Sequence, residues 1–248
     1  MTDWFGAIRR ALHPLEAPPA PPAWNHDHLL DLLGEGPRAD AAVLMAIRDV
    51  SDPRVVFTLR RDDLVRHAGQ VSFPGGRTDH GDAGAIGTAL RESHEEVGLD
   101  PDAAEPLGFL DCLETISGFC VTPVVARMTG DAVLTPEPGE VAKIFEVPLA
   151  FLLDPANLHE FEFRARGEAR LVYEYKGVEP RIWGATASML VMPFTAWLDS
   201  GAAQMIVPGP AAANVLRTRI GMPLVTAGAI VCGWMTLAPK YASSIASL

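Results

Sequence analysis

The stretch of the chain with the most evident chemistry is a short acidic segment preceded by two glycines. The sequence RESHEEVGL, residues 91–99, holds one arginine and three glutamates, and a Gly-Gly pair stands before it at 75–76. On a helix, Glu92 and Glu96 lie almost above each other, and Glu95 lies on the flank of the same stripe. Carboxylates crowded in this way raise one another's pKa values unless a cation lies between them. Such a cluster of oxygen ligands suits Mg²⁺ or Mn²⁺.

The glycines and the arginine have separate expected roles. Gly75 and Gly76 allow backbone angles closed to other residues, so a turn there lets a backbone group approach a metal or a phosphate closely. Arg91 can pair with Glu95 one helical turn on, and we expect it to orient a carboxylate rather than to bind a metal. Metal ions at this place would neutralise a diphosphate and activate a water for in-line attack on phosphorus.

The elements that must position these groups form a mixture of strands and helices. The acidic helix is expected over 83–97, with Gly98 as its C-cap. Strands are expected at 41–47, 55–59, 70–73, 106–113, 121–127 and 144–147, followed by a hairpin of 159–166 and 169–175. Further helices are expected at 3–12, 26–33, 149–153 and 184–198. Because no regular βαβ repeat appears, we predict an α+β fold, an α/β/α sandwich with a mixed central sheet.

Composition excludes several classes of function. The net charge of −11 argues against broad nucleic-acid binding, which needs a basic surface. The three cysteines are scattered and form no C-x-x-C pair, which argues against a structural zinc site and fits a reducing compartment. Arg9 and Arg10 interrupt the apolar start of the chain, so we expect no signal peptide and a cytoplasmic location.

We expect three segments in the 248 residues. Residues 1–39 would form an N-terminal arm with a proline-rich linker, 40–199 a catalytic domain, and 200–248 an apolar C-terminal extension. Within the extension, Met222–Ala238 carries no charge over 17 residues, the lower edge of a membrane span. Its proline and glycines favour an apolar tail packed on the domain, with membrane contact as the alternative. A homodimer is left open.

The acidic segment resembles the box of the Nudix hydrolases, G-x5-E-x7-R-E-U-x-E-E-x-G-U, where U is a bulky apolar residue. The second half, Arg91 to Leu99, keeps the spacing of the box. The first half is shifted: five residues after Gly76 comes Asp82, eight residues rather than seven separate Asp82 from Arg91, and Ser93 replaces a bulky residue. The role of Asp82 therefore cannot be copied from the standard box.

Within that family the chain resembles the coenzyme A pyrophosphatase branch. Residues 60–76, RRDDLVRHAGQVSFPGG, match its signature R-[S]-x-x-L-x-x-H-x-G-Q-[VI]-x-F-P-G-G with one departure, and 121–125 and 182–187 match further segments. The resemblance runs from about Asp40 to Leu190. It implies a Nudix-type fold and metal-dependent hydrolysis of the diphosphate of coenzyme A or acyl-coenzyme A, giving 3′,5′-ADP and (acyl-)4′-phosphopantetheine.

The resemblance also assigns residues. The metal ligands would be Gly76, Glu92, Glu95 and Glu96. The catalytic residues would be Glu95, Glu96, the organising Arg91, and Glu140 as a base or extra ligand. The expected partner is a small molecule, and the basic and polar residues around the Gly-Gly pair are candidates to bind its phosphates: Arg60, Arg66, His67, Gln70 and Arg77.

Two other functions stay open. One is a Nudix hydrolase that acts on ADP-ribose, NADH or an oxidised nucleotide, against which the residue 60–76 signature argues. The other is a nucleotide-sensing module without catalysis. Loss of catalysis should first damage the carboxylates, and all three are present.

Overall fold

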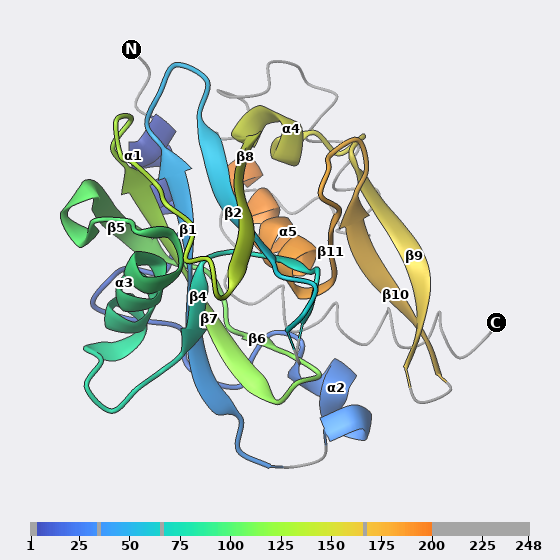
Figure 1. The fold of residues 1–248 in the computed structure, drawn as a ribbon. Coiled ribbons are helices and arrows are strands. Elements are labelled where there is room, and N and C mark those ends of the chain that lie inside the picture. The colour runs from blue at the N-terminus through green and yellow to red at the C-terminus, as the bar shows by residue number, and fades with distance from the viewer. Residues whose placement is uncertain (1–3, 34–35, 65–66, 166–167, 200–248) are drawn as a thin grey trace.

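The computed structural model describes residues 4–33, 36–64, 67–165 and 168–199 (Figure 1). The expectations for Arg66, for the apolar run 222–238 and for the extension 200–248 lie outside these residues. Among the described helices, none is long and apolar enough to cross a membrane.

The main sheet is mixed, as predicted. Its strands are β1 (Ala39–Arg48), β2 (Arg54–Arg60), β3 (Val71–Ser72), β4 (Gly75–Arg77), β5 (Ala104–Phe109), β6 (Leu113–Glu114), β7 (Phe119–Met128) and β8 (Val141–Pro148). The order is β3-β2-β1-β7-β5, with β4 paired to β1, β6 to β7 and β8 to β2. The long strands β1 and β7 run parallel, while β2 and β4 pair with β1 antiparallel.

Helices cover both faces of this sheet, which makes the fold an α/β/α sandwich. The helices are α1 (Trp4–Arg10), α2 (His26–Leu33), α3 (Gly84–Val97), the 3-10 helix η1 (Pro101–Ala103), α4 (Leu149–Leu153) and α5 (Gly184–Asp199). Strand β1 buries side chains alternately on either face: Leu44 packs in the cluster that includes Val97 of α3, and Met45 in the opposite cluster with Ile8 of α1 and Leu190 of α5.

A smaller sheet lies beside the main one (Figure 1). It consists of the hairpin β9 (Leu158–Ala165) and β10 (Glu168–Tyr175), with the short strand β11 (Ile182–Trp183) on its inner side. Helix α5 follows β11 directly, and the Thr186 hydroxyl donates a hydrogen bond to the Val71 carbonyl of β3 at 2.8 Å. This contact joins α5 to the segment that leads into the two glycines.

One expectation about local structure needs correction here. The predicted strand 106–113 is divided into β5 and β6, because the chain leaves the β7 ladder between them. The N-terminal segment, which was predicted to form an arm, packs against the catalytic domain. His13 exchanges two backbone hydrogen bonds with Phe109, and Ile8 is fully buried in the core. The boundary at residue 40 stays a proposal.

Candidate active site

The two glycines form a strand rather than the predicted turn. Gly75 and Gly76 belong to β4 and lie opposite Val43 and Ala42 of β1. Gly75 has a φ of 154°, and a Cβ there would lie 2.4 Å from the Ala42 carbonyl oxygen. A Cβ on Gly76 would lie 2.4 Å from a carboxylate oxygen of Glu92. Glycine is therefore required at Gly75, where the backbone of β1 approaches closely, and at Gly76 the missing Cβ leaves room for the carboxylate of Glu92, an acid of the box.

Helix α3 brings the acids to this strand. Its buried face includes Ala89 and Val97, which pack against the sheet, and Gly98 ends it in the left-handed conformation with φ 65°. Ser93, in place of the usual bulky residue, is fully buried. Its hydroxyl donates a 2.6 Å hydrogen bond to the Ala89 carbonyl, so the polar group is satisfied inside the core. The departure at Ser93 thus leaves the helix intact.

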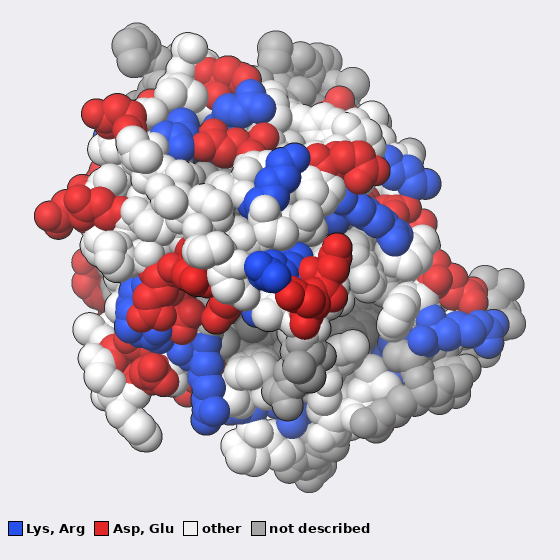
Figure 2. Space-filling model, viewed as in Figure 1, with Lys and Arg blue, Asp and Glu red and all other residues white. Residues whose placement is uncertain are grey.

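The three glutamates of the box are not equivalent. Glu96 is only 6% exposed and accepts hydrogen bonds from the Gly75 N–H at 3.2 Å and from Arg60 at 3.3 Å. Glu92 is 18% exposed and accepts from Arg91 at 2.8 Å. Glu95 is 59% exposed and lies 3.4 Å from Arg91. Acidic side chains gather over α3 in the surface view (Figure 2). Glu96 is therefore buried and Glu92 half-buried, while Glu95 faces outward.

Burial changes the acidity of the two inner carboxyl groups. It raises the pKa of Glu96 to about 7, although the Gly75 N–H and the Arg60 charge act in the opposite direction. Burial also raises the pKa of Glu92, against the effect of Arg91. Glu140 adds negative charge to both. Because the charged forms of these carboxyl groups are disfavoured, a bound cation would stabilise the site.

The donor set fits a hard divalent cation, since it offers carboxylate oxygens beside a glycine whose missing Cβ leaves room for Glu92. Within the described ranges, no three His, Cys, Asp or Glu side chains are arranged as a ready-made metal cluster. Instead, Arg91 and Arg60 lie against the acids. The assignment of Gly76, Glu92, Glu95 and Glu96 as ligands therefore stays a prediction.

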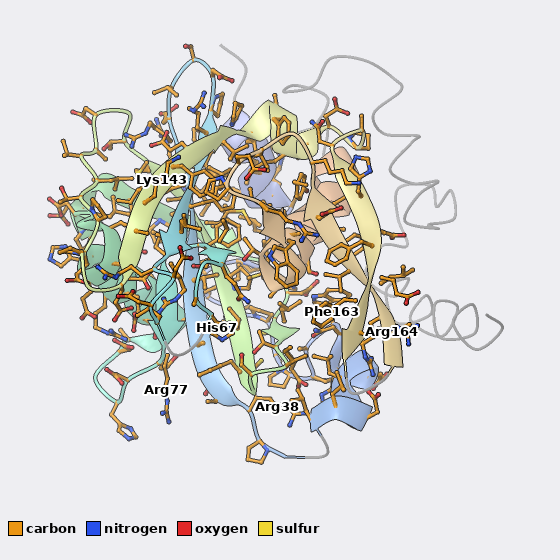
Figure 3. The ribbon with its side chains drawn as sticks, turned by 45° about the vertical axis from the view of Figure 1, so that its right-hand side comes forward. Arg38, His67, Arg77, Lys143, Phe163 and Arg164 are labelled. Carbon is orange, nitrogen blue, oxygen red and sulfur yellow. The ribbon has the colours of Figure 1, made fainter. Side chains whose placement is uncertain are left out.

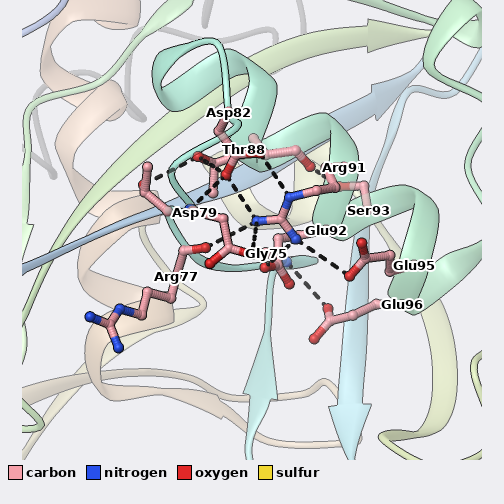
Figure 4. A network of polar contacts seen from close by, with 12 residues as sticks. Gly75, Arg77, Asp79, Asp82, Thr88, Arg91, Glu92, Ser93, Glu95 and Glu96 are labelled. Atoms are coloured by element: carbon pink, nitrogen blue, oxygen red, sulfur yellow. Dashed lines mark hydrogen bonds and ion pairs between the residues drawn. The ribbon is translucent and has the colours of Figure 1, made fainter.

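Asp82 is the principal partner of Arg91, a role that sequence reasoning left open (Figure 4). Its two oxygens accept hydrogen bonds from Nε and Nη2 of Arg91 at 2.8 and 2.9 Å, and from the Asp79 N–H and the Thr88 hydroxyl, each at 2.9 Å. These bonds, with that of Arg91 first, hold the pKa of Asp82 well below its usual range. The same contact raises the pKa of Arg91.

Arg91 is consequently fixed from several sides. Besides Asp82, its guanidinium donates to Glu92 and to the Arg77 carbonyl oxygen at 3.1 Å. The predicted contact with Glu95 is present, but it is the longest of the set. The arginine therefore joins the loop before α3, the end of β4 and the acids of the helix, which agrees with the expected orienting role.

A second arginine lies on the other side of Glu96. Arg60 closes β2, and its guanidinium reaches Glu96 at 3.3 Å and Glu140 at 3.5 Å. The backbone ties the same groups together: Arg60 N–H donates to the Gln70 carbonyl, and Arg61 N–H donates to the Glu140 carbonyl. Glu140, far away in sequence, is thus brought beside the box.

Three further candidate substrate residues, His67, Gln70 and Arg77, lie just before β3 or at the end of β4. His67 has a positive φ of 56°, and its Nδ1 shares a 2.9 Å hydrogen bond with the side-chain oxygen of Gln70. His67 comes from the loop after β2 and Arg77 from the end of β4 (Figure 3). The Arg77 side chain points away from the Arg91 network (Figure 4). The structure therefore supports a positioning contact of His67 on Gln70, whereas Arg77 contributes its carbonyl to the network.

Comparison with known proteins identifies the family. The model of the NUDIX domain matches residues 37–166. A relative described as an uncharacterized Nudix hydrolase, NudL, from Photorhabdus laumondii subsp. laumondii is 41% identical over 150 residues, which cover 60% of this chain and 80% of the relative. NudL of Escherichia coli (strain K12) is 39% identical, over 60% of this chain and 78% of the relative. The chain belongs to the Nudix hydrolase family.

Solved structures of this family also align with the chain. A MutT/nudix family protein from Enterococcus faecalis covers 76% of both chains with 12% identity and a TM-score of 0.45. The Nudix hydrolase RenU from M. smegmatis covers 46% of this chain and 72% of its own, with 21% identity and a TM-score of 0.39. Nudix hydrolases generally use divalent metals such as Mg²⁺ or Mn²⁺ and act on small nucleotide-derived substrates.

Proposed function

We propose that the chain hydrolyses the diphosphate of coenzyme A, or of acyl-coenzyme A, to 3′,5′-ADP and (acyl-)4′-phosphopantetheine. The observation that carries this proposal is the connection between the box and the residue 60–76 segment. Glu96 accepts from the Gly75 N–H and from Arg60, and Arg60 in turn donates its backbone N–H to Gln70. The segment that resembles the coenzyme A branch is thus built into the wall of the acidic site.

In the proposed site, Glu92 and Glu96 would hold Mg²⁺ or Mn²⁺ at the buried end, with Glu95 at the exposed flank and the Gly76 carbonyl oxygen as a further ligand. When bound, such an ion would offset the charge of the diphosphate and help to activate a water. Arg91 orients Glu92 and Glu95, because it contacts both and is itself clamped by Asp82.

Glu140 is the proposed acceptor of the proton from the attacking water, or an extra ligand. Its side chain is 54% exposed, so it can exchange that proton with solvent, and it lies 3.5 Å from the guanidinium of Arg60. His67 and Gln70 are proposed to contact the nucleotide, and Arg60, Arg66 and Arg77 its phosphates. We place the catalytic domain at 40–199, flanked by the N-terminal segment 1–39 and the extension 200–248.

A product assay tests this proposal. Purified protein would be given coenzyme A, acetyl-coenzyme A, ADP-ribose and NADH in separate reactions with Mg²⁺ or Mn²⁺, and products would be separated by chromatography. We expect coenzyme A to yield equal amounts of 3′,5′-ADP and 4′-phosphopantetheine. Cleavage of ADP-ribose or NADH with coenzyme A intact would replace the substrate by another nucleotide. Binding without cleavage of any of the four would indicate a nucleotide-sensing module.

A further inference from the structure

Arg60 lies beside two carboxylates, but its guanidinium makes only weak hydrogen bonds. Its contacts with Glu96 and Glu140, at 3.3 and 3.5 Å, lie at the long end of hydrogen-bond distances. Its Nε is buried and has no hydrogen-bond partner among the residues that the structure describes. Buried donors are nearly always paired, so an unpaired guanidinium nitrogen in a functional site points to a partner that binds there.

The groups that Arg60 neutralises are the same groups that a divalent cation would neutralise. Glu96 is almost completely buried, and without Arg60 its charge would be countered only by the Gly75 N–H among its described contacts. A carboxylate oxygen that turns to a metal ion loses part of its attraction for the arginine. The freed guanidinium then needs an anion, and the planar array of donors matches a phosphate group.

We infer that Arg60 couples cation binding to substrate binding, because its guanidinium exchanges the two carboxylates for a phosphate group. Without a divalent cation, Arg60 contacts both Glu96 and Glu140 and partly neutralises their negative charge. When the cation binds these carboxylates, Arg60 turns its guanidinium to a phosphate oxygen of the substrate. This inference rests on the proposed function for the site, but the residue and its two states are specific to Arg60.

Linkage makes the inference measurable without turnover. If the cation releases Arg60 to the substrate phosphate, the cation must raise phosphate affinity, and the phosphate ligand must raise cation affinity by the same factor. Couplings of this kind are typically about 5- to 150-fold. The probes are Mn²⁺ alone, followed by its electron paramagnetic resonance signal, and 3′,5′-ADP, followed by calorimetry with and without Mn²⁺.

The informative variant is Arg60→Gln, which removes the charge and keeps polar atoms. We expect Arg60→Gln to bind Mn²⁺ alone more tightly than the wild type, on the order of tenfold, because the positive charge that lies 3.3 Å from the Glu96 carboxylate is gone. We also expect Mn²⁺ to raise its 3′,5′-ADP affinity much less than in the wild type. The matched control is Arg61→Gln, since Arg61 is exposed and contacts Asp63 and the Pro138 carbonyl instead of the box.

Mn²⁺ affinity in Arg60→Gln equal to or below that of the wild type would overturn the inference, provided that circular dichroism shows a folded variant. If Arg60→Gln does not fold, Arg60→Lys keeps the charge but lacks the planar fork. It should bind Mn²⁺ like the wild type and still lose most of the coupling, and full coupling in Arg60→Lys would refute the inference. If coenzyme A is not cleaved while Mn²⁺ affinity rises in Arg60→Gln, the substrate proposal fails and the role of Arg60 stands.

Discussion

Two arginines contact the acids of the box, and they are held in opposite ways. Arg91 donates through all three of its nitrogens, with bonds of 2.8 and 2.9 Å to Asp82 and 2.8 Å to Glu92. Arg60 makes contacts of 3.3 and 3.5 Å and leaves a buried nitrogen unpaired among the described residues. Arg91 also contacts the proposed ligand Glu92, but it is anchored by Asp82, which is not a proposed ligand. The side-chain contacts of Arg60 are with Glu96 and Glu140, both of which the proposed chemistry would engage.

The shifted register of the box affects the residues that hold Arg91. The extra residue falls in the loop between β4 and α3, and the loop uses Asp82 to fix Arg91. The carboxylates on the helix keep their spacing, and Glu96 still reaches the Gly75 N–H. The shift therefore alters the support of the site and leaves its acidic end in place.

The largest expected loss of activity comes from a substitution of Glu96, the buried carboxylate that Arg60 contacts. Glu96→Gln removes a proposed ligand and the charge that Arg60 opposes. Metal stabilisation of phosphoryl transfer is worth several kcal/mol, so we expect kcat to fall about 10³-fold. Steady-state hydrolysis of coenzyme A measures this, with Glu162→Gln on the exposed face of β9 as the control. Near wild-type turnover in Glu96→Gln would remove Glu96 from the site.

The same substitution should also remove a pH dependence of the unfolding free energy in the metal-free protein. Because the pKa of Glu96 is raised from 4.5 to about 7, the folded state binds its proton more tightly than the unfolded state. Its stabilising contribution is complete below about pH 4.5 and is lost as the pH rises through about 7. Relative to Glu96→Gln, the wild type should lose on the order of 3 kcal/mol over this range.

Urea denaturation in EDTA at several pH values would measure this difference in unfolding free energy. A pH-independent difference between wild type and Glu96→Gln would contradict the burial of an ionisable Glu96. Asp82 has the opposite sign: its lowered pKa stabilises the fold above about pH 4 and loses that effect as the pH falls further. The two regions should therefore respond to pH in opposite directions.

A smaller loss of activity is expected when the contact between Arg91 and Asp82 is removed. Asp82→Ala leaves Arg91 without its bidentate partner, so Glu92 and Glu95 lose their fixed orientation. Misplacement of a catalytic group by about 1 Å can cost roughly 10²-fold, and we expect a loss of that size in kcat. Asp79→Ala is the matched control, because the Asp79 carboxylate is exposed and lies 4.0 Å from Arg91. Equal activity in the two variants would show that Asp82 has no positioning role.

Much of the architecture was predictable from local pattern. Helices α2 and α4 begin and end where the sequence predicts them, and Gly98 caps α3 as expected. These features depend on nearby residues: apolar periodicity, a glycine after the last turn, and proline before the first. The conversion of the Gly-Gly turn into β4 was not predictable in this way, because it depends on pairing with β1, more than thirty residues earlier.

The site shows the same division. The spacing of Glu92, Glu95 and Glu96 places them on one side of a helix, but only the packing of β4 decides which of them is buried. The partner of Arg91 was missed because the Asp79–Asp82 loop must fold back over nine residues to reach it. An acidic residue displaced from its standard position was the one signal that could have suggested Asp82 as the replacement.

The contrast between the two arginines can be observed directly by nuclear magnetic resonance of the Nε–Hε groups. Wild-type protein labelled with ¹⁵N-arginine would be titrated with Mg²⁺ in the absence of substrate, with Arg60→Gln and Arg91→Lys used for assignment. We expect the Arg60 resonance to shift with Mg²⁺ and to shift again on addition of 3′,5′-ADP, while the Arg91 resonance remains near its metal-free position. An Arg60 resonance that is unaffected by either addition, with Arg91 moving instead, would contradict this expectation.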